Sequence, residues 1–301
     1  MRTSIPASDS SEDGAAARRP ATRSLSRQVL RRLGRSKGAL VGIVILAALV
    51  LAALAAPWLT PYDPLAINPI DRLQPPNRRH WLGTDVLGRD LLTRILFGAR
   101  VSLQTGLISV TIAILIGVPM GLLAGFYGGL TDRSLMRVVD LMLTFPGILL
   151  ALVIIAILGP DLFNAMLAVG VSASPVFARV VRATVLSSKE QAYVEGARAV
   201  GCSNMRIMLR HILPNTAAPI IVLGTLGVAG AIIAAAALSY LGLGARPPAP
   251  EWGALLSEGR NYLRVAWWMT TFPGLAIMTA VLSINLLGDG LRDAFDPRLQ
   301  S

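Results

Sequence analysis

Charged side chains are scarce in this chain. Asp, Glu, Lys and Arg make up 15% of its 301 residues, against about 25% in soluble domains. The few charges are also unevenly placed, because six long windows contain none of them. A helix needs roughly 17–25 mostly apolar residues to cross the core of a bilayer, and every window reaches that length. The windows are residues 38–62, 101–131, 141–160, 162–178, 212–245 and 265–288.

This placement excludes an ordinary soluble protein. Buried helices of a large soluble protein would rarely leave six such windows uncharged, whereas each charge inside a bilayer costs several kcal/mol. The sequence therefore predicts an all-α membrane protein with six transmembrane helices, whose two termini lie on the same side.

Cysteine, histidine and lysine are nearly absent. The single cysteine, Cys202, rules out an internal disulfide. The two histidines, His80 and His211, fall on opposite sides of the membrane in this topology, which argues against a metal site. We interpret His80 as an ordinary loop residue and His211 as a polar residue of a surface helix. The only lysines, Lys37 and Lys189, lie outside any Gly-x-x-x-x-Gly-Lys-Ser/Thr loop, so we expect neither ATP hydrolysis nor a bound cofactor in this chain.

Arginine, by contrast, is abundant and gives a net charge of +11. The basic residues cluster beside the apolar windows rather than along one soluble face, which argues against nucleic acid as a partner. With the N-terminus inside, the predicted cytoplasmic segments carry 19 Lys and Arg and the outer segments carry 9. This bias predicts that both termini are cytoplasmic. A basic group directly before the first window fits an anchor facing anionic lipid; it consists of Arg27, Arg31, Arg32, Arg35 and Lys37.

The layout along the chain begins with a tail that has no apolar periodicity and is predicted to be disordered. The first window could be a cleaved signal peptide with its cleavage site at Ala53-Leu54-Ala55, but its apolar stretch is longer than the 7–15 residues of a signal sequence, so we favour a retained helix. The expected regions are the tail 1–24, the first helix with a long outer loop 25–100, a core of five helices 101–288 and a cytoplasmic C-terminal tail 289–301.

The outer loop, residues 63–100, is the first sizeable segment outside the membrane, and its prolines exclude a continuous helix in its first half. From Asp85 onward, apolar residues recur at helical spacing while Arg89, Asp90 and Arg94 take the other face. This pattern fits an amphipathic helix on the outer membrane surface or a lead-in helix to the second span.

Proline is frequent inside the windows. Pro146-Gly147 and Pro273-Gly274 are predicted to interrupt two spans, and further breaks are predicted at Pro119, Pro175 and Pro219. Small residues in the same windows indicate either close helix contacts or lipid-tolerant composition; they include Gly106, Gly117, Gly121, Gly227 and Gly230.

The largest cytoplasmic loop, roughly residues 182–215, carries the most specific pattern. Its later part predicts a helix, a break and a second helix. Gly201 can take the left-handed conformation that ends the first helix, Ser203 can cap the second, and Pro214 limits how far the second continues.

One face of that second helix is apolar. Such a face can lie in the groove of a partner protein or rest on lipid, and the spacing alone leaves both possibilities open. The face consists of Met205, Met208, Leu209 and Ile212.

The same loop resembles the EAA loop of ABC importer permeases, whose pattern is Glu-Ala-Ala, three residues, Gly, nine residues, Ile, any residue, Leu-Pro. Two positions depart from it, because Gly196 replaces an alanine and His211 stands where isoleucine is usual. The matching positions are Glu195, Ala197, Gly201, Leu213 and Pro214. In that family the loop is a coupling helix that docks on the ATPase, so the resemblance implies this role for residues 189–215.

Other stretches are similar to the dipeptide, oligopeptide and nickel importer family. They are Gly83–Asp90, Gly98–Leu103, Leu241–Gly244 with Pro247–Gly253, Leu287–Asp293 and Asp296–Arg298. The likeness covers about residues 28–298 and points to the second, C-type permease of the pair.

The resemblance implies a type I importer permease in the bacterial inner membrane. Its expected partners are a homologous B-type permease, two cytoplasmic ATPases that use ATP and Mg²⁺, and an extracytoplasmic solute-binding protein. The substrate is expected to be a short peptide, with nickel chelates and glutathione as alternatives. Candidates for the outer gate are Asp85, Arg89, Asp90 and Arg100.

An ion-coupled secondary transporter is the alternative from another class. Such proteins usually need ionisable groups inside the bilayer, whereas here the charges fall at window edges, as with Asp140 and Arg179. We interpret Asp140 as a carboxylate at a helix start, with a gate residue as the alternative.

Overall fold

The computed structural model describes residues 32–295. The predicted tail 1–24, Arg27, Arg31 and the residues after 295 lie outside the described residues. Within 32–295 the chain is helical and forms no strand beyond an isolated bridge between Thr84 and Asp90. The elements are α2 (Lys37–Leu59), η1 (Pro69–Asp71), α3 (Leu91–Tyr127), α4 (Gly129–Thr144), α5 (Gly147–Leu158), α6 (Leu162–Ser188), α7 (Ala192–Ala199), α8 (Asn204–Arg206), the π-helical turn η2 (Ile207–Ile212), α9 (Leu213–Tyr240), α10 (Trp252–Gly259), η3 (Arg260–Tyr262) and α11 (Trp268–Phe295).

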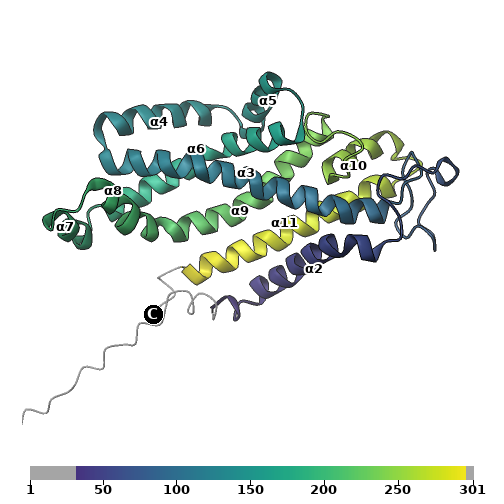
Figure 1. The fold of residues 1–301 in the computed structure, drawn as a ribbon, viewed down its shortest axis with the longest axis horizontal. Coiled ribbons are helices and arrows are strands. Elements are labelled where there is room, and N and C mark those ends of the chain that lie inside the picture. The colour runs from purple at the N-terminus through teal and green to yellow at the C-terminus, as the bar shows by residue number, and fades with distance from the viewer. Residues whose placement is uncertain (1–31, 296–301) are drawn as a thin grey trace, which may run out of the picture.

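The six-span prediction is confirmed, with one span broken. Five helical segments are long and apolar enough to cross a membrane, and α4 with α5 supplies a sixth, bent by 96° between its halves. The helices form an elongated bundle in which α3, α6 and α9 lie between the pair α2 and α11 on one side and α4 with α5 on the other (Figure 1). The elements α7 and α8 lie at one end, and the loop before α3 lies with α10 at the other (Figure 1).

Glycines let the central helices approach closely. An added Cβ on Gly117 or Gly121 of α3 would meet backbone oxygens of α6, namely those of Ser174 and Ala178. Gly106 and Gly227 also face neighbouring helices, whereas Gly230 has nothing within 4 Å. Close helix contact is therefore the correct interpretation for four of the five glycines that the sequence indicated.

The prolines break the helices less than predicted. The chain does turn sharply at Pro146, between α4 and α5. The breaks predicted at Pro119, Pro175, Pro219 and Pro273 are wrong, because each of these lies inside a continuous helix. A proline removes one hydrogen bond, which a membrane helix tolerates when its surroundings satisfy the freed carbonyl.

The segment before the second span is a lead-in and not a surface helix. The α3 helix begins at Leu91 and continues through the span to Tyr127. The carboxylate of Asp90 caps it by accepting the Thr93 amide at 2.8 Å. Arg89, Asp90 and Arg94 are all buried, so the prediction of an exposed polar face here is wrong. Residues 132–140, expected as a loop, belong to α4.

Candidate functional site

Residues 189–215, which we call the elbow, are helix, break and helix at one end of the bundle (Figure 1). The predicted left-handed glycine is confirmed, since Gly201 has a φ of +76°. The amide of Cys202 donates to the Ala197 carbonyl at 3.0 Å, which closes the end of α7. Ser203 takes the capping position of α8, but its side chain makes no capping hydrogen bond, so that prediction is wrong.

The inner side of the elbow is packed on the ends of α3 and α6. Val194 and Ala197 of α7 are buried together with Met208 and other residues of the π-helical turn. The same cluster contains Phe126 from α3 and Val185 from α6. The elbow is therefore joined to α3 and α6 by apolar contact. Because packed interiors transmit strain, a displacement of the elbow would also displace the ends of these two helices.

The predicted apolar face of the second helix is divided. Met208 and Ile212 are buried against the chain's own core, whereas Met205 and Leu209 are 59% and 51% exposed. The reason is the π-helical turn, which changes the spacing at which residues share a face. The prediction that these four residues form one continuous apolar face is therefore wrong.

Pro214 does not end the second helix, contrary to prediction. The helical path from Asn204 runs on to Tyr240. Pro214 is the second residue of α9 and removes one amide hydrogen from this continuous path, which a membrane helix tolerates when its surroundings satisfy the freed carbonyl. The π-helical turn directly precedes it, and Asn215 Nδ2 donates to the His211 carbonyl at 2.6 Å. His211 is half-buried within that turn.

The outer surface of the elbow combines exposed apolar and charged residues. Glu195, Gly201 and Pro214 are exposed and Leu213 is half-buried. Val200, at the break, is 79% exposed. This surface has the mixture of apolar and charged groups that protein interfaces use.

A second cluster of charges lies at the other end of the bundle, and we call it the outer cluster. Asp85 Oδ2 accepts hydrogen bonds from Arg89 Nε and from Arg94, each at 2.6 Å. Glu258 of α10 accepts from Arg89 at 2.9 Å and from Arg94 at 2.6 and 3.1 Å. Asp85, Arg89 and Arg94 are almost completely buried. The outer cluster thus ties α10 to the start of α3 through paired charges.

His80 and Asp90 form a neighbouring buried pair. The Nδ1 atom of His80 lies 2.9 Å from an Asp90 carboxylate oxygen, and His80 is 4% exposed. The interpretation of His80 as an ordinary loop residue is therefore wrong. Neither this pairing nor the contacts of Glu258 were predicted. For Glu258 the reason is that no local pattern links α10 to the loop before α3.

Two further polar groups join helices near this end. Arg100 donates to the carbonyls of Ala53 and Leu54, at 2.6 and 2.8 Å, and so holds α3 on the end of α2. Glu251 caps α10 by accepting the Ala254 amide at 2.9 Å, and Ser102 Oγ lies 3.3 Å from its other oxygen. Burial raises the pKa of the Glu251 carboxyl, against the lowering effect of these hydrogen bonds.

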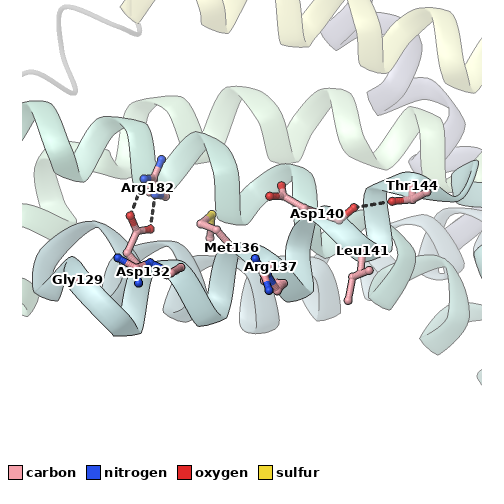
Figure 2. A pocket seen from close by; sticks show the side chains of 9 residues that line it. Gly129, Asp132, Met136, Arg137, Asp140, Leu141, Thr144 and Arg182 are labelled. Atoms are coloured by element: carbon pink, nitrogen blue, oxygen red, sulfur yellow. Dashed lines mark hydrogen bonds and ion pairs between the residues drawn. The ribbon is translucent and has the colours of Figure 1, made fainter.

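A polar groove of about 840 Å³ runs along α4. Asp132 accepts two hydrogen bonds from Arg182 of α6, at 2.5 and 2.6 Å, and Asp140 accepts one from Arg179 at 2.7 Å. Figure 2 shows the Asp132–Arg182 pair at one end of the groove and Arg137 and Asp140 farther along α4. Asp140 lies in the last two turns of α4, so its interpretation as a helix-start carboxylate is wrong.

Residues 117–301 match the family described as the inner membrane component of binding-protein-dependent transport systems. Residues 24–76 match the N-terminal transmembrane domain of oligopeptide transport permease C.

Several permease proteins are similar over nearly the whole chain. The dipeptide transport system permease protein of Alkalihalophilus pseudofirmus is 49% identical over 275 residues, which cover 91% of this chain and 90% of that protein. The di/tripeptide transport system permease protein of Pseudomonas aeruginosa is 46% identical and covers 88% and 90%. The glutathione transport system permease protein of Pectobacterium atrosepticum is also 46% identical and covers 91% and 92%.

A solved structure shares the fold. An inward-facing conformation of the MetNI methionine ABC transporter contains a chain with a TM-score of 0.54 and 21% identity, covering 67% of this chain and 97% of that one. Together with the matched family and the apolar spans, these similarities show that the chain is a multi-pass membrane protein that belongs to the family of inner membrane components of binding-protein-dependent transport systems.

Proposed function

We propose that the chain is the C-type permease of an ATP-driven importer of short peptides. It pairs with a homologous B-type permease, two cytoplasmic ATPases and an extracytoplasmic solute-binding protein. The relatives named for dipeptides and di/tripeptides support peptides as the substrate. The relatives named for glutathione keep that tripeptide as the alternative.

In this proposal the chain catalyses no reaction and binds no cofactor. The partner ATPases use ATP and Mg²⁺, and their closure moves the elbow. The chain lies in the inner membrane with its N-terminus, C-terminus and elbow in the cytoplasm, which the excess of basic residues in those segments supports.

The observation that carries the proposal is the two-sided construction of the elbow. Its inner side is buried against α3 and α6, and its outer side leaves Met205, Leu209 and Val200 exposed. An ATPase bound to the outer side of the elbow would move the elbow and the ends of α3 and α6 together as a rigid unit. Rigid-body motion of this kind can switch a bundle between two states when the nucleotide favours one of them.

The outer cluster is proposed to be part of the outer gate. It joins α10, which stands between the last two spans, to the start of α3. Alternating access requires the outer end to open when the inner end closes, so a buried connection at this position would have to move as a unit. The proposed gate residues are Asp85 and Arg89 of the outer cluster, together with Asp90 and Arg100, which lie near it.

Substitutions in the elbow test the coupling. We expect Gly201→Val or Glu195→Trp to lower peptide uptake about tenfold, in the range of ordinary coupling energies, while ATP hydrolysis by the reconstituted importer persists. The Cβ of residue 201 has free space, so the strain comes only from its positive φ. Gly196→Ala is the matched control, because Gly196 is also exposed, has nothing within 4 Å and has no positive φ.

Labelling provides a second measurement. In a Cys202→Ser background, Val200→Cys should react with a maleimide in the isolated permease and be protected when the ATPases are bound. Normal transport by both elbow variants, together with unchanged labelling, would show that the ATPases couple elsewhere.

A further inference from the structure

The exposed face of α4 carries charges in a helix that forms half of a membrane span. Val139 is the only fully buried residue of α4. Arg133 and Arg137 are exposed, and neither guanidinium forms an ion pair or a side-chain hydrogen bond within residues 32–295. Arginine is costly against lipid tails. This face must therefore lie against water or polar groups in the assembled importer.

The groove on this face combines both signs of charge. Arg133 and Arg137 are four residues apart and so lie one helical turn from each other on the same side of α4. Asp132 and Asp140 flank them, and the Asp140 carboxylate remains 60% exposed although it is paired with Arg179. The volume of about 840 Å³ falls within the range of sites for small solutes.

The two carboxylates are already paired with arginines of α6, Asp132 with Arg182 and Asp140 with Arg179. Arg133 and Arg137 therefore leave the groove with a net positive charge, which attracts an anionic group such as a carboxylate or a phosphate. A zwitterionic peptide offers a carboxylate for an arginine and an ammonium group for Asp140. Guanidinium groups form strong paired hydrogen bonds with carboxylates.

We propose that Arg133 and Arg137 bind the C-terminal carboxylate of the peptide during its passage along the groove, with Asp140 as the counterpart for its ammonium group. The proposal rests on the function proposed above and adds the substrate-facing residues. The contact is transient, because the peptide has to leave the groove again. It is expected to affect the rate of passage.

The test crosses a change in the protein with a change in the substrate. The complete importer is reconstituted in liposomes with its binding protein saturated by either Ala-Ala or Ala-Ala amide, which lacks the carboxylate. We expect the double variant Arg133→Gln/Arg137→Gln to transport Ala-Ala about tenfold more slowly, as expected for a lost charged hydrogen bond, and to transport the amide at the wild-type rate. Arg292→Gln is the control, because Arg292 is an exposed arginine near the end of another span.

The other occupants of the groove give different outcomes. Equal losses for Ala-Ala and its amide would mean that the arginines contact the partner permease or serve gating. A loss that disappears in pure phosphatidylcholine vesicles and returns with phosphatidylglycerol would assign them to lipid phosphate. An unchanged Ala-Ala rate, or an equal loss in Arg292→Gln, would also overturn the proposal. Failure of the wild-type importer to take up peptide with ATP would instead refute the function itself.

Discussion

At the scale of single residues, the outer cluster is a set of buried charges that compensate one another. Two arginines and two carboxylates leave no net charge, and every carboxylate oxygen of Asp85 and Glu258 accepts at least one hydrogen bond. Removing a charge from water is costly, so such a set is tolerable only while it is complete. The Nε atom of Arg94 is buried without a partner, which makes the set less than fully satisfied.

Removing one member should therefore lower the free energy of unfolding by more than the complete set contributes to it. We expect Arg94→Met to destabilise the protein by about 3–5 kcal/mol, because it leaves a buried carboxylate uncompensated. Adding Glu258→Met should recover much of this loss, since the pair Asp85–Arg89 remains intact. Thermal unfolding of the purified protein in detergent measures both effects, with the exposed Arg264→Met as the control. A single variant as stable as the control, or a double variant less stable than the single one, would contradict this account.

The sequence could not predict this cluster. Arg89 and Arg94 were placed on the polar face of a helix, either on the membrane surface or leading into the second span, and that placement followed from their local spacing. Their burial arises because α10, more than 150 residues later in the chain, covers them with Glu258. Contacts of this range depend on the whole fold and leave no trace in helical periodicity.

At the scale of elements, the contact between α3 and α6 depends on the absence of side chains. Gly117 and Gly121 lie one turn apart on α3 and meet the α6 backbone, and Gly125 continues the row toward Val185 and Arg182. Small residues at this spacing allow two membrane helices to approach until their backbones touch.

A larger side chain at the centre of this row should separate the helices. We expect Gly121→Leu to destabilise the protein by about 1–3 kcal/mol or more through overpacking against backbone, which cannot turn aside as a side chain can. Gly230→Leu is the matched control, because Gly230 also lies inside a span but has open space around it. The apparent melting temperatures of the two variants in detergent give the comparison. Equal melting temperatures would mean that α3 and α6 are not held together at this row.

Helices were predicted more reliably than their irregularities. The charge-free windows identified five spans, because a bilayer penalises charge wherever it occurs. Of the bent pair α4 and α5, the window 141–160 contained α5 but only the last residues of α4, whose earlier turns carry charges. Proline was a poor guide, since four of the five sites where it was expected to interrupt a span lie in continuous helices. The π-helical turn at Ile207–Ile212 was not predicted either, and it divided the face formed by Met205, Met208, Leu209 and Ile212. Such turns depend on one extra residue in the hydrogen-bond ladder, which residue types alone do not encode.

At the scale of the whole molecule, the two ends of the bundle differ in chemistry. The elbow itself carries Lys189, Arg198, Arg206 and Arg210, and basic residues are typical of the cytoplasmic side. Exposed tryptophans gather at the opposite end, where Trp58, Trp81 and Trp267 are 84%, 71% and 52% exposed. Tryptophan favours the interface between lipid and water, so these residues fit the outer surface of the bilayer.

The orientation can be tested with residues on either side of the first span. In a Cys202→Ser background, Arg35→Cys and Ile70→Cys place one thiol before α2 and one after it, at positions that are both exposed. In intact cells with a permeabilised outer envelope, a membrane-impermeant maleimide should label residue 70 and not residue 35, and in inside-out vesicles the pattern should reverse. Because α2 is the only span between the two positions, the reverse result in both preparations would place the elbow outside the cell. An outward elbow has no access to cytoplasmic ATPases, so this one measurement decides whether ATP-driven coupling through residues 189–215 is possible at all.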